Sequence, residues 1–221
     1  MKSELIKDTC LQYKIENYTI NQDLSIDVDG NVDLSSTNLA ILPIKFGRVM
    51  GDFNVQNNLL STLYGAPVAV GGNFNCYHNR LTNLIGSPKW VGADFFCYKN
   101  QLASLEGSPK VVRGSYYVSG NKLSNLVGCT LMIGCNFSCD DTLISTFSGE
   151  EDIDFEGVLF LNETHYDQLN DRKLPFEIIE NRHHLKLILK YQRYFGIWND
   201  DQTFNKECFN DLIADINEGL K

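Results

Sequence analysis

Hydrophobic and polar positions along the middle of this chain follow a pattern that returns every 21 residues. In each unit an aromatic residue is followed two positions later by a second apolar residue, which is the period of a β-strand. Two leucines and a glycine complete the unit. The aromatic column contains Phe53, Phe74, Phe95, Tyr116 and Phe137. A fixed period of this length predicts a solenoid, in which equivalent residues of successive coils become neighbours.

Three further columns predict what lies inside each coil. The apolar column two residues after the aromatic one contains Val55, Cys76, Cys97, Val118 and Cys139. We interpret its cysteines as small buried apolar side chains, not as zinc ligands or disulfides. An asparagine column, Asn58, Asn79, Asn100 and Asn121, predicts a buried ladder that satisfies backbone groups at a corner of the coil. The glycine column, Gly65, Gly86, Gly107 and Gly128, permits backbone with positive φ.

The segments FNCYHNRLTNL (74–84) and FFCYKNQLASL (95–105) resemble the L-x-L-x-x-N-x-L-x-x-L core of leucine-rich repeats. The resemblance is closest to the short bacterial type and covers residues 28–153, with Phe in place of the first Leu. The repeat also resembles uncharacterised repeat proteins encoded by bacteriophages. The resemblance implies an α/β, β-rich solenoid with one short parallel strand per 21-residue coil. It also implies a protein-binding module. Its partner would be a host protein in the host cytoplasm, which the module would inhibit by occupying a site on it.

The chain divides into three parts. Residues 1–27 are expected to form an N-terminal helix and capping strand, residues 28–161 a solenoid of about six coils plus an edge strand at 155–161, and residues 162–221 a helical C-terminal cap. The helix is expected over 3–13 with Ser3 as its N-cap. Its inward face should contain Leu5, Ile6, Cys10 and Leu11.

Short sequence motifs for turns and helix ends predict a cap at each end of the repeat. Alternating apolar residues on both sides of Asp29-Gly30 predict a β-hairpin that covers the first coil. After the repeat, Pro175 opens a helical segment that Gly196 ends, and Asn205 is expected to cap a last helix.

Composition narrows the function classes. The net charge is −9, which disfavours a direct partner of duplex nucleic acid. No apolar run is long enough for a membrane span, and the charged start of the chain argues against secretion. We therefore expect a cytoplasmic protein. Neither a phosphate-binding loop nor a metalloprotease or hydrolase motif is present, so we expect neither enzymatic activity nor a cofactor or metal.

The candidate binding site is a strip of aromatic residues on the outward positions of the middle coils. These residues are Tyr77, Phe96, Tyr98 and Tyr117, with Asn75 and Asp94 beside them. Tyrosine and phenylalanine are enriched at the centres of protein interfaces, so the strip predicts a protein partner. The other interpretation is a self-supporting aromatic ladder, or a surface that the C-terminal helices cover.

Two charged segments leave other functions open. The acidic residues Asp140, Asp141, Glu150, Glu151 and Asp152 form either a solvated loop or a mimic of nucleic acid that blocks a nucleic-acid-binding protein. One helix face contains the cations Arg182, Lys186, Lys190 and Arg193. This face is either the solvent-exposed side of an amphipathic helix or a site for an anionic partner. A third alternative is sequestration of a small molecule between the last coil and the C-terminal helices.

Overall fold

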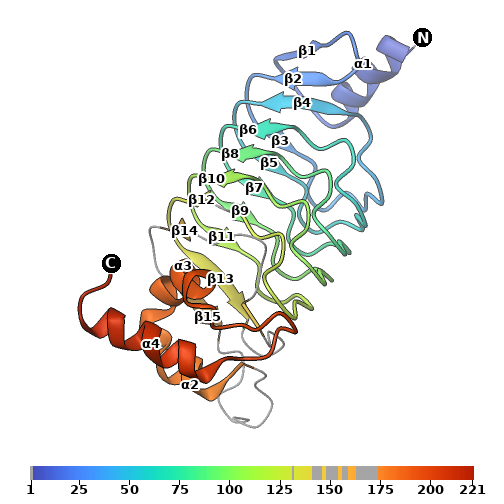
Figure 1. Cartoon of the computed structure of the whole chain (residues 1–221). Coiled ribbons are helices and arrows are strands. Elements are labelled where there is room, and N and C mark those ends of the chain that lie inside the picture. Colours follow the sequence, from blue (N-terminus) through green and yellow to red (C-terminus); the bar gives the residue numbers. More distant parts are fainter. Residues whose placement is uncertain (1, 131, 141–145, 148–153, 156–158, 163–173) are drawn as a thin grey trace.

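The computed structural model shows an elongated stack of coils with helices at both ends (Figure 1). The structure describes residues 2–130, 132–140, 146–147, 154–155, 159–162 and 174–221. Helix α1 (Lys2–Gln12) lies at the first coil, and helices α2 (Phe176–Glu180), α3 (Leu185–Phe195) and α4 (Lys206–Asn217) lie beyond the last one.

Two sheets run along the stack. An eight-stranded sheet, here sheet A, has the order β1 (Tyr18–Ile20), β2 (Ile26–Val28), β4 (Phe46–Val49), β6 (Ala69–Val70), β8 (Trp90–Val91), β10 (Val111–Val112), β12 (Met132–Ile133) and β14 (Asp154–Phe155). A seven-stranded sheet, here sheet B, contains β3 (Val32–Asp33), β5 (Phe53–Asn54), β7 (Phe74–Asn75), β9 (Phe95–Phe96), β11 (Tyr116–Tyr117), β13 (Phe137–Asp140) and β15 (Leu159–Asn162). All pairings between successive coils are parallel.

The predicted β-rich solenoid with 21-residue coils is confirmed, because Phe53 pairs with Phe74 and Phe74 with Phe95 in register. The prediction counted one strand per coil, whereas the structure has two. The additional strand belongs to sheet A, and its inward residue is buried in each coil from β4 to β12. This column contains Val49, Val70, Val91, Val112 and Ile133. The valine column and the aromatic column lie on either side of a short corner, so each coil contributes one strand to each sheet. The edge strand expected at 155–161 is likewise two strands, β14 in sheet A and β15 in sheet B.

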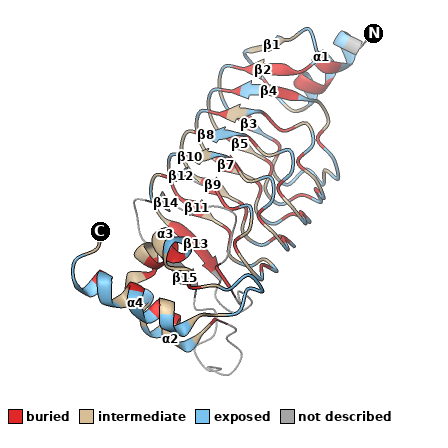
Figure 2. Ribbon diagram, in the orientation of Figure 1, coloured by how far each residue is buried: buried red, intermediate tan, exposed pale blue. Residues whose placement is uncertain are grey.

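The core is a continuous set of buried residues that runs along the stack (Figure 2). The rings of Phe53 and Phe74 stack at 5.5 Å, and those of Phe74 and Phe95 at 5.2 Å. Tyr116 takes the same column fully buried, and its hydroxyl lies 2.9 Å from the Ser108 hydroxyl, which satisfies the only polar atom in the stack. Cys76, Cys97 and Cys139 are buried as expected. Burial raises the pKa of the Cys76 and Cys97 thiols, so both stay protonated.

The asparagine ladder is confirmed. The side-chain amide of Asn100 donates to the carbonyls of Cys76 and Cys97, at 3.0 and 3.1 Å, and its Oδ1 accepts from the Leu81 N–H at 3.1 Å. Asn79 makes the equivalent bonds one coil earlier. One side chain per coil therefore satisfies backbone groups of its own coil and of the preceding one.

A second polar ladder occupies the corner between sheets A and B. Asp52 Oδ1 accepts from the Asn73 N–H at 2.6 Å, and Asp94 Oδ1 accepts from the Ser115 N–H at 2.6 Å. The ladder explains why glycine precedes some of these residues, since a Cβ on Gly72 would lie 2.1 Å from Asp52 Oδ1. The predicted glycine column lies on the strand-free side of the coil, where Gly107 has φ +86°.

The N-terminal cap differs from the prediction in two respects. The expected hairpin around Asp29-Gly30 is wrong, because β2 and β3 belong to different sheets and Gly30 forms the corner between them. The antiparallel pair is β1 with β2, one strand earlier. In α1, Ser3 lies inside the helix and is not its cap. Only part of the expected inward face is buried: Ile6 and Cys10 are, whereas Leu5 and Leu11 are exposed.

The C-terminal cap agrees with the sequence signals. Gly196 ends α3 in the left-handed conformation, and the Asn205 side chain accepts from the Cys208 N–H at the start of α4. Helix α3 buries Leu185, Ile188 and Leu189 and contacts both β14 and α4, so it joins the last coil to the final helix.

Candidate functional site

The four predicted aromatic residues lie together on the outer face of sheet B. Tyr77 and Tyr98 stack at 4.3 Å with an angle of 9° between the rings, and Phe96 and Tyr117 stack at 4.9 Å with an angle of 3°. An edge contact of 6.4 Å between Phe96 and Tyr98 joins the two pairs. We call these four residues the aromatic strip. It extends over three coils, and the parallel register of β7, β9 and β11 holds it in place.

All four rings of the strip are half-buried. Each therefore packs on its neighbours and still exposes part of its surface. Burial, together with the adjacent Tyr77 hydroxyl, raises the pKa of Tyr98 to about 12. Tyr98 is thus a neutral donor and acceptor at physiological pH.

The two polar residues predicted beside the strip have different positions. Asn75 is half-buried and pairs in register with Phe96, so it borders the strip. Asp94 lies in the corner ladder, where its Oδ1 is bonded to the next coil. Because the corner of each coil needs an acceptor for a backbone N–H, Asp94 has a structural task that its position in the sequence did not reveal.

The strip is a ladder and an accessible surface at once. The ladder interpretation is supported by the ring contacts. The C-terminal helices lie beyond the last coil in Figure 1, whereas the strip lies on the middle coils, so these helices do not cover it. Asn54 and Asn75 continue the register row of Phe96 toward the first coils, and the exposed Lys99 follows Tyr98 directly.

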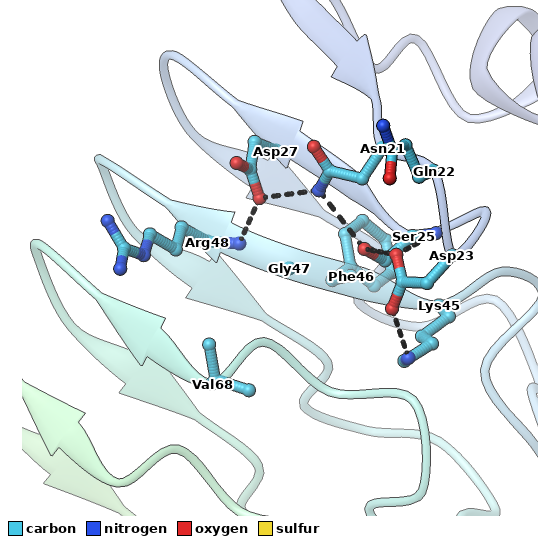
Figure 3. Close-up of a pocket in the computed structure, with 10 residues that line it drawn as sticks. All are labelled: Asn21, Gln22, Asp23, Ser25, Asp27, Lys45, Phe46, Gly47, Arg48 and Val68. Atoms are coloured by element: carbon cyan, nitrogen blue, oxygen red, sulfur yellow. Dashed lines mark hydrogen bonds and ion pairs between the residues drawn. The ribbon is translucent and has the colours of Figure 1, made fainter.

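A recess of about 550 Å³ lies at the N-terminal end of sheet A (Figure 3). Most of its polar side chains bond to one another. Lys45 Nζ lies 2.6 Å from Asp23 Oδ2, and this hydrogen bond holds the pKa of the Asp23 carboxyl well below its usual range. Asp27 Oδ1 accepts from the Asn21 side chain and from the Arg48 N–H. The recess therefore offers few polar groups to a ligand, and it lies at the opposite end from the predicted small-molecule pocket beside the C-terminal helices.

The acidic candidates Asp141, Glu150, Glu151 and Asp152 lie outside the described residues, as does the side chain of Asp140. Within the described part of the chain, no group of three or more His, Cys, Asp or Glu side chains is placed to hold a metal ion. None of the helices that the structure describes is both long and apolar enough to cross a membrane.

The basic face predicted after residue 181 is divided between solvent and packing. Arg182 and Arg193 are exposed, whereas Lys186 and Lys190 are half-buried. Lys190 Nζ lies 3.4 Å from the Lys221 carbonyl oxygen and 5.2 Å from the centre of the Tyr191 ring. At least one of these cations therefore helps to hold the end of the chain against α3.

Sequence reasoning missed the outer face of sheet A, because it did not predict that sheet. Arg48, Ala69, Trp90, Val111 and Met132 are in register along it. Trp90 and Met132 are exposed by 38% and 59%. The signal in the sequence is the buried valine column, whose preceding positions must point outward.

No family model, no curated protein and no solved structure matches this chain. The geometry of its own surfaces is therefore the basis for any function assigned to it.

Proposed function

We propose that this chain is a protein-binding module and that the aromatic strip is the centre of its partner surface. The observation that carries the proposal is the joining of four half-exposed rings into one surface on three rigid coils. Rings that are already stacked lose little conformational freedom when a partner covers them. Tyrosine also adds a hydroxyl that hydrogen-bonds at the edge of an apolar contact.

The surroundings of the strip define the kind of contact. Most residues beside the rings are uncharged, with Lys99 after Tyr98 as a charged neighbour, so apolar contact and hydrogen bonds would dominate and salt should have only a small effect on binding. The function we propose is steric: the module occupies a site on its partner or holds a complex inactive. The resemblance of the repeat to bacteriophage proteins supports a host protein as that partner.

The proposal is tested by affinity purification from host lysate with quantitative mass spectrometry. The test variant carries Tyr98→Ala and Tyr117→Ala. Its matched control carries Tyr64→Ala and Tyr194→Ala, which remove two tyrosines that are exposed by 81% and 83% outside the strip. We expect the test variant to lose at least about nine-tenths of the captured partner, in line with the loss of two hot-spot residues, and the control to retain it.

Thermal unfolding of both variants is measured in parallel, because Tyr98→Ala and Tyr117→Ala each remove a ring from a stack. If a folded test variant captures as much partner as the wild type does, the aromatic strip is not the binding site. If capture of the partner decreases with salt but is unaffected by Tyr98→Ala and Tyr117→Ala, the acidic segment is favoured as the binding site instead.

A further inference from the structure

The outer face of sheet A from β4 to β12 has a charge opposite to that of the whole chain, whereas the flanking strands β2 and β14 contain Asp27 and Asp154. The five segments that form this part of the face and its flanks are 46–51, 67–72, 88–93, 109–114 and 130–135. Together they contain four cations, Arg48, Lys89, Lys110 and Arg113, and no Asp or Glu, whereas the chain as a whole has a net charge of −9. All four cations are exposed, and within the described part of the chain none of them forms an ion pair.

Exposed apolar side chains lie between these cations. Val68, Trp90 and Met132 are exposed by 50%, 38% and 59%. Trp90 follows Lys89 directly and pairs in register with Val111, the residue after Lys110. Successive coils are about 4.8 Å apart, so these apolar and basic side chains form one continuous surface.

The indole of Trp90 is held against the sheet. A Cβ on Gly92 would lie 2.8 Å from Cη2 of Trp90, so the ring extends along the coil over a position that has no side chain. The glycine thus leaves room for the ring to remain close to the backbone. An aromatic ring fixed in this way, with cations beside it and no carboxylate, is an anchor of the kind that protein interfaces use.

We propose that the outer face of sheet A binds an acidic peptide segment that also carries apolar side chains. Carboxylates of the segment would pair with Lys89, Lys110 and Arg113, and its apolar residues would contact Trp90, Val111 and Met132. Charge complementarity selects this occupant, because every charged residue of the face from β4 to β12 is a cation. A nucleic acid would use the cations equally well but would leave the apolar row without a partner, since Trp90 is the one exposed ring that these strands offer for base stacking. This surface is separate from the aromatic strip, so the two proposals succeed or fail independently.

The test measures binding of fluorescein-labelled peptides to the whole chain by fluorescence anisotropy. From β4 to β12 the face spans about 19 Å, which an extended peptide of about six residues covers, so a probe of about twelve residues is sufficient. The first probe alternates Glu with Leu and Phe. The second replaces its Leu and Phe with Ser at the same charge, and the third is an oligouridylate with the same number of charges.

The test variant carries Lys89→Glu, Lys110→Glu and Arg113→Glu. Its matched control carries Arg80→Glu, Lys99→Glu and Lys122→Glu, which change the net charge by the same amount outside sheet A. We expect at least a tenfold loss of affinity for the first probe in the test variant and less than a twofold change in the control. A version with Gln at the three test positions should show an intermediate loss. Trp90→Ser should weaken binding severalfold, whereas Trp90→Phe should restore most of it.

Four results would overturn the proposal. These are failure of the wild type to bind the first probe, equal losses in the test variant and the control, equal affinity for the serine probe, and tighter binding of the oligouridylate. The last result would assign the face to nucleic acid. A test variant that fails to fold is replaced by the Gln version, to which the same criteria apply.

Discussion

Replacement of Asn100 by alanine tests the physical basis of the whole stack. Asn100 is 8% exposed and bonds closely to three backbone groups in two coils, with a fourth, longer bond of 3.5 Å to the Tyr98 carbonyl. Those groups are not equally dependent on it. The Cys76 carbonyl also accepts from the Asn79 amide, and the Cys97 carbonyl also accepts from the Asn121 amide. The Leu81 N–H, in contrast, has Asn100 Oδ1 as its acceptor.

The expected loss follows from this difference. An orphaned buried N–H costs about 1–3 kcal/mol, and each weakened carbonyl bond adds about 0.5 kcal/mol. Asn100→Ala should therefore destabilise the protein by about 2–4 kcal/mol. Asn100→Asp should be worse at neutral pH, because a carboxylate oxygen would face the two carbonyls. Its pKa would be raised in the folded state, so the loss should shrink as the pH falls from that raised pKa toward the ordinary Asp value, and should be smallest below the ordinary value.

The measurement is urea unfolding followed by circular dichroism. Gln101→Ala is the matched control, since it removes a side-chain amide from the adjacent, exposed position and should change stability by less than about 0.5 kcal/mol. An Asn100→Ala loss below about 1 kcal/mol, or one equal to that of the control, would show that water or backbone shifts satisfy the Leu81 N–H.

Three further predictions concern single positions. Gly72→Ala should cost about 1–3 kcal/mol because its Cβ would meet Asp52 Oδ1 at 2.1 Å; a double-mutant cycle with Asp52→Ala should show a smaller loss, and additive losses would contradict the steric cause. Burial raises the pKa of the Cys76 thiol, so iodoacetamide should modify the exposed Cys135 and spare Cys76 in the folded protein, as mass spectrometry can determine. Tyr98 has a pKa of about 12 in the folded state against 10.0 ordinarily, so the unfolded state ionises first as the pH rises. Its contribution to stability is complete below pH 10 and is lost up to about pH 12, and Tyr98→Phe should flatten the fall of Tm over that range.

The sequence predicts those parts of the fold in which one residue type recurs at one position. The register of Phe53, Phe74 and Phe95 and the bonding of Asn79 and Asn100 follow from the period alone, because stacked coils place equal side chains together. The second sheet was missed for a physical reason. Its strands are two residues long in most coils, too short to show an alternation.

The ends of the stack were harder to predict than its middle. Asp29-Gly30 has the composition of a hairpin turn, but a corner between two sheets requires the same backbone freedom, and Gly30 has φ +150° there. In α1 only one narrow face meets the first coil, so Leu5 and Leu11 remain exposed although their spacing suits burial. Where an element has a single neighbour, periodicity overestimates the buried face.

The two ladders and the aromatic core leave the outward positions of each coil free to vary, and this freedom helps to separate structure from function. A side chain that stabilises stacking is useful in every coil, and the buried asparagine is indeed repeated from Asn58 to Asn121. The corresponding register column of sheet B is different, since it runs Asp33, Asn54, Asn75, Phe96, Tyr117, Ser138 and Phe160. Two aromatic residues are neighbours in this column only at Phe96 and Tyr117. If stacked rings served the solenoid alone, every pair of neighbouring coils would gain as much from them, so their occurrence at one pair of coils favours a surface shaped for a partner.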